Sequence, residues 1–410
     1  MKTYYVIKNL VTGNYLAPME TELFDRDIVG AGKWPDKQSA IDWISNIHNV
    51  YIIGGQQLYD EAIKHPYCKR IYLTRIDKEV ECDRFFDTHN ILDSNYNLVS
   101  SNIDYEDNIK LDFCVYDNKI QYTNLEELQY LSLIRTILDK GISKDDRTNV
   151  GTRSMFGTSM KFSLRDNTIP LLTTKRVFWK GIVEELLWFI KGSTDSKILE
   201  NKGINIWKGN TSREFLDKMN LNYEEGDIGP MYGFQWRHFG AKYIDKYTDY
   251  NGIGVDQLKN CINMLKSDKN SRRIVMSSWN ASDLDKMVLN PCHVLCQFYV
   301  ENNELHSSMY QRSGDIGLGI PFNIVSYSLL THMIAQVVGL NAGSFTIFIG
   351  DTHIYNTHIE PLKIQLDRTP KEFPKVYLNE NINNIDDFKY EDIKLEGYNP
   401  YPKIEMEMAI

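Results

Sequence analysis

The chain has 410 residues, enough for two or three domains, and its 42% hydrophobic and 25% charged content is typical of a soluble globular protein. Its 55 acidic residues outnumber its 46 basic ones, so a net charge of −9 argues against a protein dedicated to nucleic acid or to an anionic membrane surface. No apolar run reaches the roughly 18 residues of a membrane span, and the N-terminus does not resemble a signal peptide. We therefore expect a cytoplasmic protein whose six scattered cysteines are reduced thiols.

The first part of the chain is expected to form two small units, over 1–49 and 50–120. No motif indicates a role for the first unit. The expected elements are a strand over 2–10, a helix over 37–47, a strand ending at Gly54 and Gly55, a helix over 56–65, and strands over 70–76 and 111–117. The glycine pair lets the backbone approach a ligand closely, although a tight turn is the commoner reason for such a pair.

Within 50–120, the motifs VYIIGGQQLYDEAIKHP, IYLTRI and ECDRFFD resemble the C-terminal half of dihydrofolate reductase. In that family the glycine pair lies against the nicotinamide cofactor. Residues 1–49 are less than half of what the family has there, and they carry none of its substrate-binding or phosphate-contacting segments. We therefore expect a reductase remnant that serves as a scaffold, with NADPH required only if the segment is functional after all.

A polar stretch from Asn118 to Asn124 marks the expected boundary of a third and largest unit, 125–410. In it, Cys292 follows a proline and precedes the β-like run of NPCHVLCQFYV. A nearby cation would make this cysteine a nucleophile, although a buried structural thiol is the commoner case. Cys292, His293 and Cys296 lack a second cluster to complete four ligands, so no metal site is expected.

The segment GIVEELLWFIKG predicts a helix over 181–192 that is apolar around most of its circumference. At least one of Glu184 and Glu185 is then desolvated, which raises the pKa of a carboxyl group and suits it to proton relay. The spacing leaves open which of the two it is.

The glycine-rich segment 310–323, YQRSGDIGLGIPFN, is interpreted by itself as a loop that carries Arg312, Asp315 and Asn323. It has neither the ending of a phosphate loop nor the glycine fingerprint of a dinucleotide site.

Further arginines are either solvated surface charges or anion ligands, and these are Arg147, Arg272 and Arg273. A thiol, a buried carboxylate, arginines and an amide together fit a small phosphorylated substrate that is attacked by sulfur.

In this order the segments closely resemble the thymidylate synthase family over 125–410. The motifs include DDRT, PLLTTKRVFWKGIVEELLWFIKGST, GPMYGFQWRHFG, SRRIVMSSWN, PCHVLCQFYV, YQRSGDIGLGIPFNI, GDTHIYNTHIEPLKIQL and EGYNPYPKIEMEMAI. A reductase-like segment before a synthase unit also resembles the fused bifunctional enzymes of some eukaryotes. The resemblance implies an α+β fold, with a large twisted mixed sheet flanked by helices and a sheet-to-sheet dimer.

The implied reaction is reductive methylation of dUMP to dTMP, with 5,10-methylenetetrahydrofolate supplying carbon and hydride and leaving as dihydrofolate. The Cys292 thiolate would add to carbon 6 of uracil, with Arg312 favouring the thiolate. Glu185 would relay protons, Tyr232 would assist removal of the carbon 5 proton, and Asn323 would hold the pyrimidine edge. The implied nucleotide contacts are Arg147, Arg272, Arg273, Arg312, Ser313, Asn323, His353 and Tyr355. The implied folate contacts are Ile206, Trp207, Asn210, Asp315 and Phe322.

Two implications concern specificity and assembly. An amide at Asn323 both donates to the uracil carbonyl and accepts from the ring N–H, whereas related hydroxymethylases that act on deoxycytidylate have aspartate there. In the family, Arg272 and Arg273 reach the phosphate of the partner subunit, so an obligate homodimer is expected.

Two departures from the family pattern, Lys208 and Asn290, remove no catalytic group. One alternative is a fully bifunctional reductase–synthase, and another is a catalytically silent nucleotide- or RNA-binding regulator. The presence of Cys292, Glu185 and Asn323, together with the acidic composition, argues against the regulator.

Overall fold

The computed structural model describes residues 59, 63, 68–77, 92, 95–106, 109–119, 124–146 and 150–408. The chain divides into two compact units, Met1–Tyr122 and Thr123–Ile410, and each is described by itself. The expected unit 1–49, the pair Gly54 and Gly55, most of the helix predicted over 56–65, and Arg147 lie outside the described residues.

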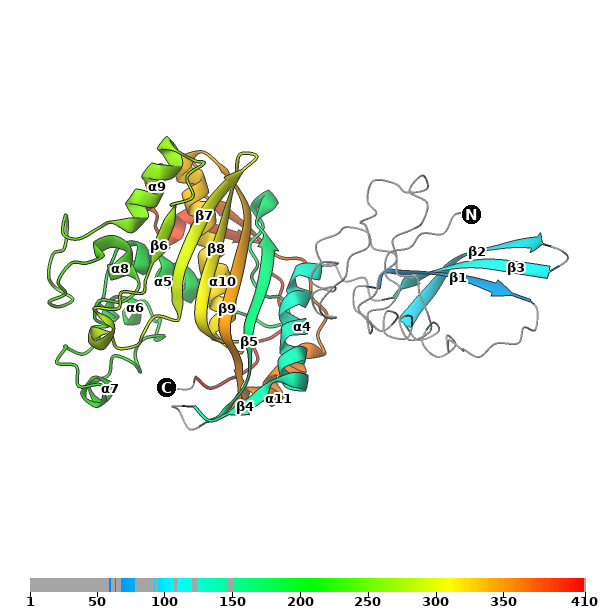
Figure 1. The fold of residues 1–410 in the computed structure, drawn as a ribbon, viewed down its shortest axis with the longest axis horizontal. Coiled ribbons are helices and arrows are strands. Elements are labelled where there is room, and N and C mark those ends of the chain that lie inside the picture. The colour runs from blue at the N-terminus through cyan, green and yellow to red at the C-terminus, as the bar shows by residue number, and fades with distance from the viewer. Residues whose placement is uncertain are drawn as a thin grey trace. The chain divides into compact units, whose positions relative to one another are not determined.

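The described part of the first unit is an antiparallel sheet of three strands in the order β1-β3-β2 (Figure 1). The strands are β1 Arg70–Ile76, β2 Tyr96–Glu106 and β3 Ile109–Asn118. β1 and β3 confirm the two strands predicted over 70–76 and 111–117. A small apolar cluster packs on the sheet, formed by Ile63, Leu92, Tyr96, Cys114 and Tyr116, with Cys68, Ile71 and Leu73 against it.

The second unit contains a six-stranded mixed sheet in the order β4-β5-β9-β8-β7-β6. Its strands are β4 Ile142–Lys144, β5 Thr152–Ser163, β6 Val275–Ser277, β7 His293–Glu301, β8 Glu304–Asp315 and β9 Asn341–Tyr355. Only β8 and β9 pair in parallel among the described strands, and the helix α10, Gly319–Val338, joins them because parallel neighbours need a crossover connection. A separate antiparallel pair is formed by β10 Lys375–Leu378 and β11 Ile393–Glu396.

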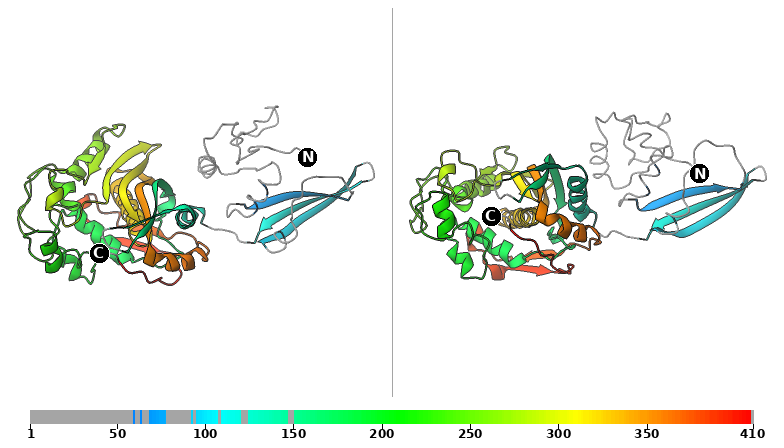
Figure 2. Two further views of the ribbon diagram at one scale, coloured as in Figure 1. Left: turned by 60° about the horizontal axis from the view of Figure 1, so that its bottom comes forward. Right: turned by 90° about the horizontal axis from the view of Figure 1, so that it is seen from below.

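Helices flank this sheet, as the predicted α+β class requires, and α10 lies behind the strands in Figure 1. The right-hand view of Figure 2 shows the same arrangement from below. The other α-helices among the described residues of this unit are α4 Leu125–Lys140, α5 Trp179–Ile190, α6 Lys197–Glu200, α7 Arg213–Lys218, α8 Gly233–His238, α9 Gln257–Ser267 and α11 Ile359–Leu366. Its described 3-10 helices are η2 Arg165–Asn167, η3 Leu284–Lys286, η4 Asn356–His358, η5 Ile385–Asp387 and η6 Tyr390–Asp392. Within the described residues, none of the helices combines the length and apolarity needed to cross a membrane.

The glycine-rich segment 310–323 is not the loop that its composition suggested. β8 continues through Asp315, and α10 begins at Gly319, so only residues 316–318 lie between them. The sequence misleads here because the strand takes its hydrogen bonds from β7 and β9, which the local composition does not reveal. The turn places the end of β8 and the start of α10 side by side, which brings the polar groups of the segment together.

Candidate active site

The thiol of Cys292 lies beside a fixed guanidinium group. Cys292 immediately precedes β7, and its carbonyl accepts a hydrogen bond of 2.8 Å from the backbone N–H of Arg312 on β8. The Arg312 side chain donates to the carbonyls of Pro291 (2.9 Å) and Asn290 (2.7 Å), and its Nη2 lies 3.9 Å from the Cys292 Sγ. A guanidinium held next to a half-buried thiol favours its anionic form.

The hydroxyl group of Tyr232 meets the backbone of the same cysteine. It accepts a hydrogen bond of 3.0 Å from the Cys292 N–H. Tyr232 has a φ of 31°, a strained backbone conformation of the kind that clusters at functional sites. Burial raises the pKa of Tyr232 well above its usual range, so the hydroxyl remains protonated at neutral pH.

His293 packs against this tyrosine. The two rings are stacked with centroids 4.0 Å apart, and the His293 Nδ1 lies 2.8 Å from the hydroxyl of Tyr327. Burial lowers the pKa of His293 to about 3, so the ring is neutral. Across the residues that the structure describes, no group of three or more histidine, cysteine, aspartate or glutamate side chains is placed to hold a metal ion.

The structure separates the two carboxylates of α5 that the sequence left undecided. Burial raises the pKa of Glu185 to about 7, although a hydrogen bond of 2.8 Å from the Trp207 Nε1 opposes that rise. Glu184 is also buried but forms an ion pair with the Lys202 Nζ at 2.6 Å. Of these two carboxyl groups, Glu185 is thus the desolvated one for which the structure gives no ion-pair partner among the described residues. The ring of Trp207 lies 6.0 Å from that of Tyr232, which joins Glu185 to the Cys292 group.

Asp315 is held at the end of β8 by several donors. Its oxygens accept from the N–H groups of Gly317 (2.8 Å) and Leu318 (3.1 Å), and its Oδ1 lies 3.5 Å from the His358 Nδ1. Burial disfavours ionisation of Asp315, but the hydrogen bond and charge of His358 outweigh it and lower the pKa of the carboxyl. The buried Lys175 donates to the carbonyl of Gly317, and burial lowers its pKa to about 8.

Neighbouring residues of the predicted site lie on β8, β9 and α10. In the parallel register, Ser313 lies opposite Asp351 and Asp315 lies opposite His353. The His353 Nδ1 is 3.1 Å from the Asp351 Oδ1, and its ring lies 5.2 Å from that of Tyr355. Phe322 and Asn323 are half-buried in the first turns of α10, Ile206 is half-buried, and Asn210 is buried.

Two predicted site residues stand apart from this group. Arg272 and Arg273 are exposed just before β6, and neither forms an ion pair with any residue for which the structure gives a position.

Two residues of the site, Lys175 and His358, were not singled out from the sequence, although they lie within motifs quoted above. Only their position in those motifs could have pointed to them, because a sequence does not show whether a single lysine or histidine is buried.

The sequence model of the thymidylate synthase family matches residues 128–410, which is more than half of the chain. The chain belongs to the thymidylate synthase family. It is 60% identical over 285 residues to the thymidylate synthase of Homo sapiens, an alignment that covers 69% of this chain and 91% of that protein. It is therefore a thymidylate synthase, a methyltransferase.

The synthase unit is preceded by a second family match. The dihydrofolate reductase model matches residues 23–118, so this similarity begins before residue 50, where the resemblance was expected to start. Bifunctional dihydrofolate reductase-thymidylate synthases are also similar over most of the chain. That of Zea mays is 48% identical over 400 residues (89% of this chain and 77% of that protein). That of Paramecium tetraurelia is 47% identical over 385 residues (92% and 83%).

Proposed function

We propose that this synthase converts dUMP to dTMP through a covalent bond between the Cys292 sulfur and carbon 6 of uracil. The observation that carries the proposal is the Arg312 Nη2 3.9 Å from the Cys292 Sγ, held there by two backbone carbonyls. Addition of the thiolate places negative charge on carbon 5, which attacks the methylene carbon of 5,10-methylenetetrahydrofolate. The methylene carbon gives up one of its two bonds to folate nitrogen in this attack. Loss of the carbon 5 proton then breaks the other bond, which leaves an exocyclic methylene group on the pyrimidine and free tetrahydrofolate. Transfer of a hydride from tetrahydrofolate to this methylene completes the methyl group, expels the Cys292 thiolate from carbon 6 and leaves dihydrofolate.

Three neighbouring groups suit the proton transfers and the substrate choice. Glu185, with a pKa near 7, can give and take protons at neutral pH. The protonated hydroxyl of Tyr232 accepts a hydrogen bond from the backbone of the nucleophile, which supports a role for it in the proton transfer at carbon 5. The half-buried amide of Asn323 can pair with a uracil edge, which has one acceptor and one donor.

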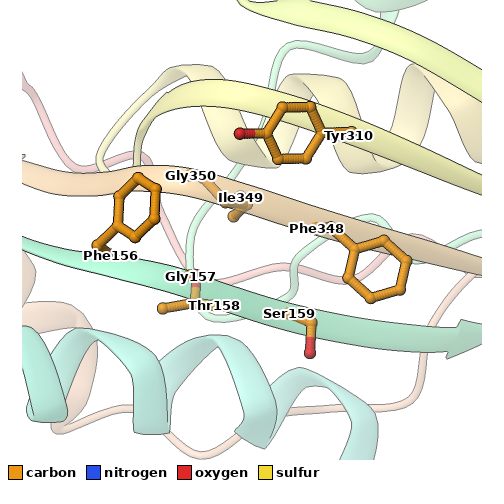
Figure 3. Close-up of a pocket in the computed structure, with 8 residues that line it drawn as sticks. All are labelled: Phe156, Gly157, Thr158, Ser159, Tyr310, Phe348, Ile349 and Gly350. Atoms are coloured by element: carbon orange, nitrogen blue, oxygen red, sulfur yellow. The ribbon is translucent and has the colours of Figure 1, made fainter.

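We also propose that two copies of the chain pack sheet to sheet and share their phosphate sites. Large aromatic rings project from the open face of the sheet, and Phe156 is 83% exposed (Figure 3). They surround a hollow of about 370 Å³ lined by Phe156, Gly157, Thr158, Ser159, Tyr310, Phe348, Ile349 and Gly350. Exposed apolar surface of this kind marks an interface. The exposed Arg272 and Arg273 are then available to a phosphate bound by the partner subunit.

Trapping of the covalent intermediate tests the proposed mechanism. A dUMP analogue with fluorine at carbon 5 cannot lose fluorine as a cation, so the adduct persists. With the methylene folate present, mass spectrometry is expected to find the mass of nucleotide and folate together on the peptide that contains Cys292. The corresponding fluorinated deoxycytidylate is expected to give no adduct, because Asn323 suits uracil. An adduct at another cysteine, or none, would contradict the mechanism.

The first unit is proposed to lack reductase activity. Support comes from residues 1–49, in which we recognise none of the substrate-binding or phosphate-contacting motifs of dihydrofolate reductase, although the family match extends back to residue 23. The purified chain is therefore expected to show no NADPH oxidation that depends on dihydrofolate, while the same preparation forms dTMP. Measurable reductase turnover would refute the scaffold interpretation and support a fully bifunctional enzyme.

A further inference from the structure

The carboxylate of Glu127, in the first turn of α4, is fully buried and surrounded by hydrogen-bond donors. Its Oε1 accepts from the N–H (2.8 Å) and the hydroxyl (2.7 Å) of Thr174. Its Oε2 accepts from the hydroxyl of Thr173 (2.7 Å), and the Thr173 N–H lies 2.9 Å from both oxygens. The Asn124 amide adds a longer contact of 3.4 Å. Burial raises the pKa of Glu127, and the bonds from the threonines act against that rise.

A first chain of contacts leads from these threonines to Asp315, through Lys175 and Gly317. The next residue, Lys175, donates through its Nζ to the carbonyl of Gly317. The N–H of Gly317 in turn donates to the Asp315 Oδ1 at 2.8 Å. Residues 173–175, here called the strap, therefore fix the turn that holds Asp315.

A second chain of contacts leads from the strap to residues 401–407, which we call the C-terminal segment. The carbonyl of Thr173 accepts from the Tyr401 N–H at 2.8 Å. The Arg368 Nη1 donates both to the carbonyl of Thr174 (2.7 Å) and to that of Pro402 (2.8 Å). Glu127 thus also anchors the backbone to which residues 401–402 attach.

The C-terminal segment returns to the same aspartate. The carbonyl of Glu407 lies 2.7 Å from the His358 Nε2, and the His358 Nδ1 lies 3.5 Å from the Asp315 Oδ1. Both routes from Glu127, through the strap and through the C-terminal segment, end at Asp315. No other buried carboxylate of the synthase unit, among the described residues, accepts from both the N–H and the hydroxyl of two successive residues.

We propose that Glu127 is a positioning residue for the folate side of the site. It holds the strap and the C-terminal segment, and through them it fixes the orientation of Asp315. The inference rests on the proposed function, in which Asp315 contacts the pterin of the folate. Because neither route passes through Cys292 or Arg312, Glu127 is expected to affect folate binding and to leave nucleotide binding unchanged.

The variant Glu127→Gln tests this inference. It keeps the shape of the side chain but replaces one carboxylate oxygen with an NH2 group, which cannot accept hydrogen bonds from Thr173 and Thr174. We expect the KM for methylenetetrahydrofolate to rise about tenfold, as for the loss of one hydrogen bond to a buried charged group. The KM for dUMP is expected to change less than about twofold, since the thiol and its guanidinium are untouched. The matched control is Glu126→Gln, one residue away, whose carboxylate accepts from the Ser163 N–H at 2.7 Å and does not contact the strap.

A second pair of variants distinguishes the loss of one hydrogen bond to Glu127 from a general loss of folding. Thr174→Val removes one donor to Glu127, whereas Thr174→Ser keeps it. The folate KM is expected to rise for valine and to recover for serine. Equal changes in both KM values, or no change in the folate KM for Glu127→Gln, would overturn the inference. A wild-type chain that forms no dTMP would refute the proposed function itself, and the inference with it.

Discussion

Replacing Cys292 with serine is expected to lower kcat for dTMP formation by at least about a thousandfold, as for the loss of a nucleophile elsewhere. A serine hydroxyl is not ionised near neutral pH, and one guanidinium 3.9 Å away cannot make it so. The affinity for dUMP is expected to remain within a few fold, because the phosphate and pyrimidine contacts persist. The absorbance change on dihydrofolate formation gives the rate, and equilibrium binding gives the affinity. Activity within about tenfold of wild type would remove Cys292 from the chemistry.

The same variant tests the shared phosphate site. The Arg273→Ala variant by itself is expected to have low activity, because the partner's active site loses a ligand of the nucleotide phosphate. When Cys292→Ser and Arg273→Ala chains exchange, half of the dimers are mixed, and each mixed dimer has one site with both groups intact. Activity is therefore expected to recover to about a quarter of wild type. No recovery after confirmed subunit exchange would show that the arginine acts within its own chain.

The nucleophile and its cation show how far the sequence alone could go. Cys292 and Arg312 are 20 residues apart. By itself, Cys292 had the commoner explanation of a buried thiol, and Arg312 was one of several polar groups in an expected loop. The antiparallel register of β7 and β8 brings them together, with His293 opposite Gln311. Such a pairing is decided by contacts between distant residues, so only the family resemblance pointed to it.

Burial accounts for most of what the sequence could not supply. The pattern of α5 predicted a desolvated carboxyl but could not choose between Glu184 and Glu185, because the choice depends on Lys202 and Trp207, which lie beyond the helix. Glu127 was missed for the same reason. A glutamate in the first turn of a helix is usually a solvated charge that favours the helix dipole. Only the folded chain places the strap over it.

Replacing Glu185 with glutamine is expected to lower kcat about a hundredfold or more, the usual contribution of a general acid–base group. Glutamine keeps an acceptor for the Trp207 Nε1 but cannot exchange a proton. In the wild type, the dependence of kcat on pH is expected to show ionisation of a group near pH 7. That feature is expected to disappear in the variant. The control Glu184→Gln, which still accepts from the half-exposed Lys202, is expected to change kcat little.

Glu185 is also expected to reduce stability as the pH rises. Burial raises its pKa from 4.5 to about 7, so the folded chain binds this proton more tightly than the unfolded chain does. Below pH 4.5 the carboxyl is neutral in both states and does not change the free energy of unfolding. As the pH rises through 7, the folded state must hold a desolvated charge, which lowers the free energy of unfolding. The cost reaches about 3 kcal/mol at most, from 1.36 kcal/mol for each pH unit of the difference.

Glu185→Gln is therefore expected to raise the free energy of unfolding by about 2–3 kcal/mol at about pH 8 and by about 1 kcal/mol or less at about pH 5. Denaturant titrations at the two pH values measure this difference, provided that the slope with denaturant is unchanged. A stabilisation that is equal at both pH values would mean that the gain comes from packing and not from the charge. A variant that is more stable and much less active would identify Glu185 as a group whose catalytic role opposes stability.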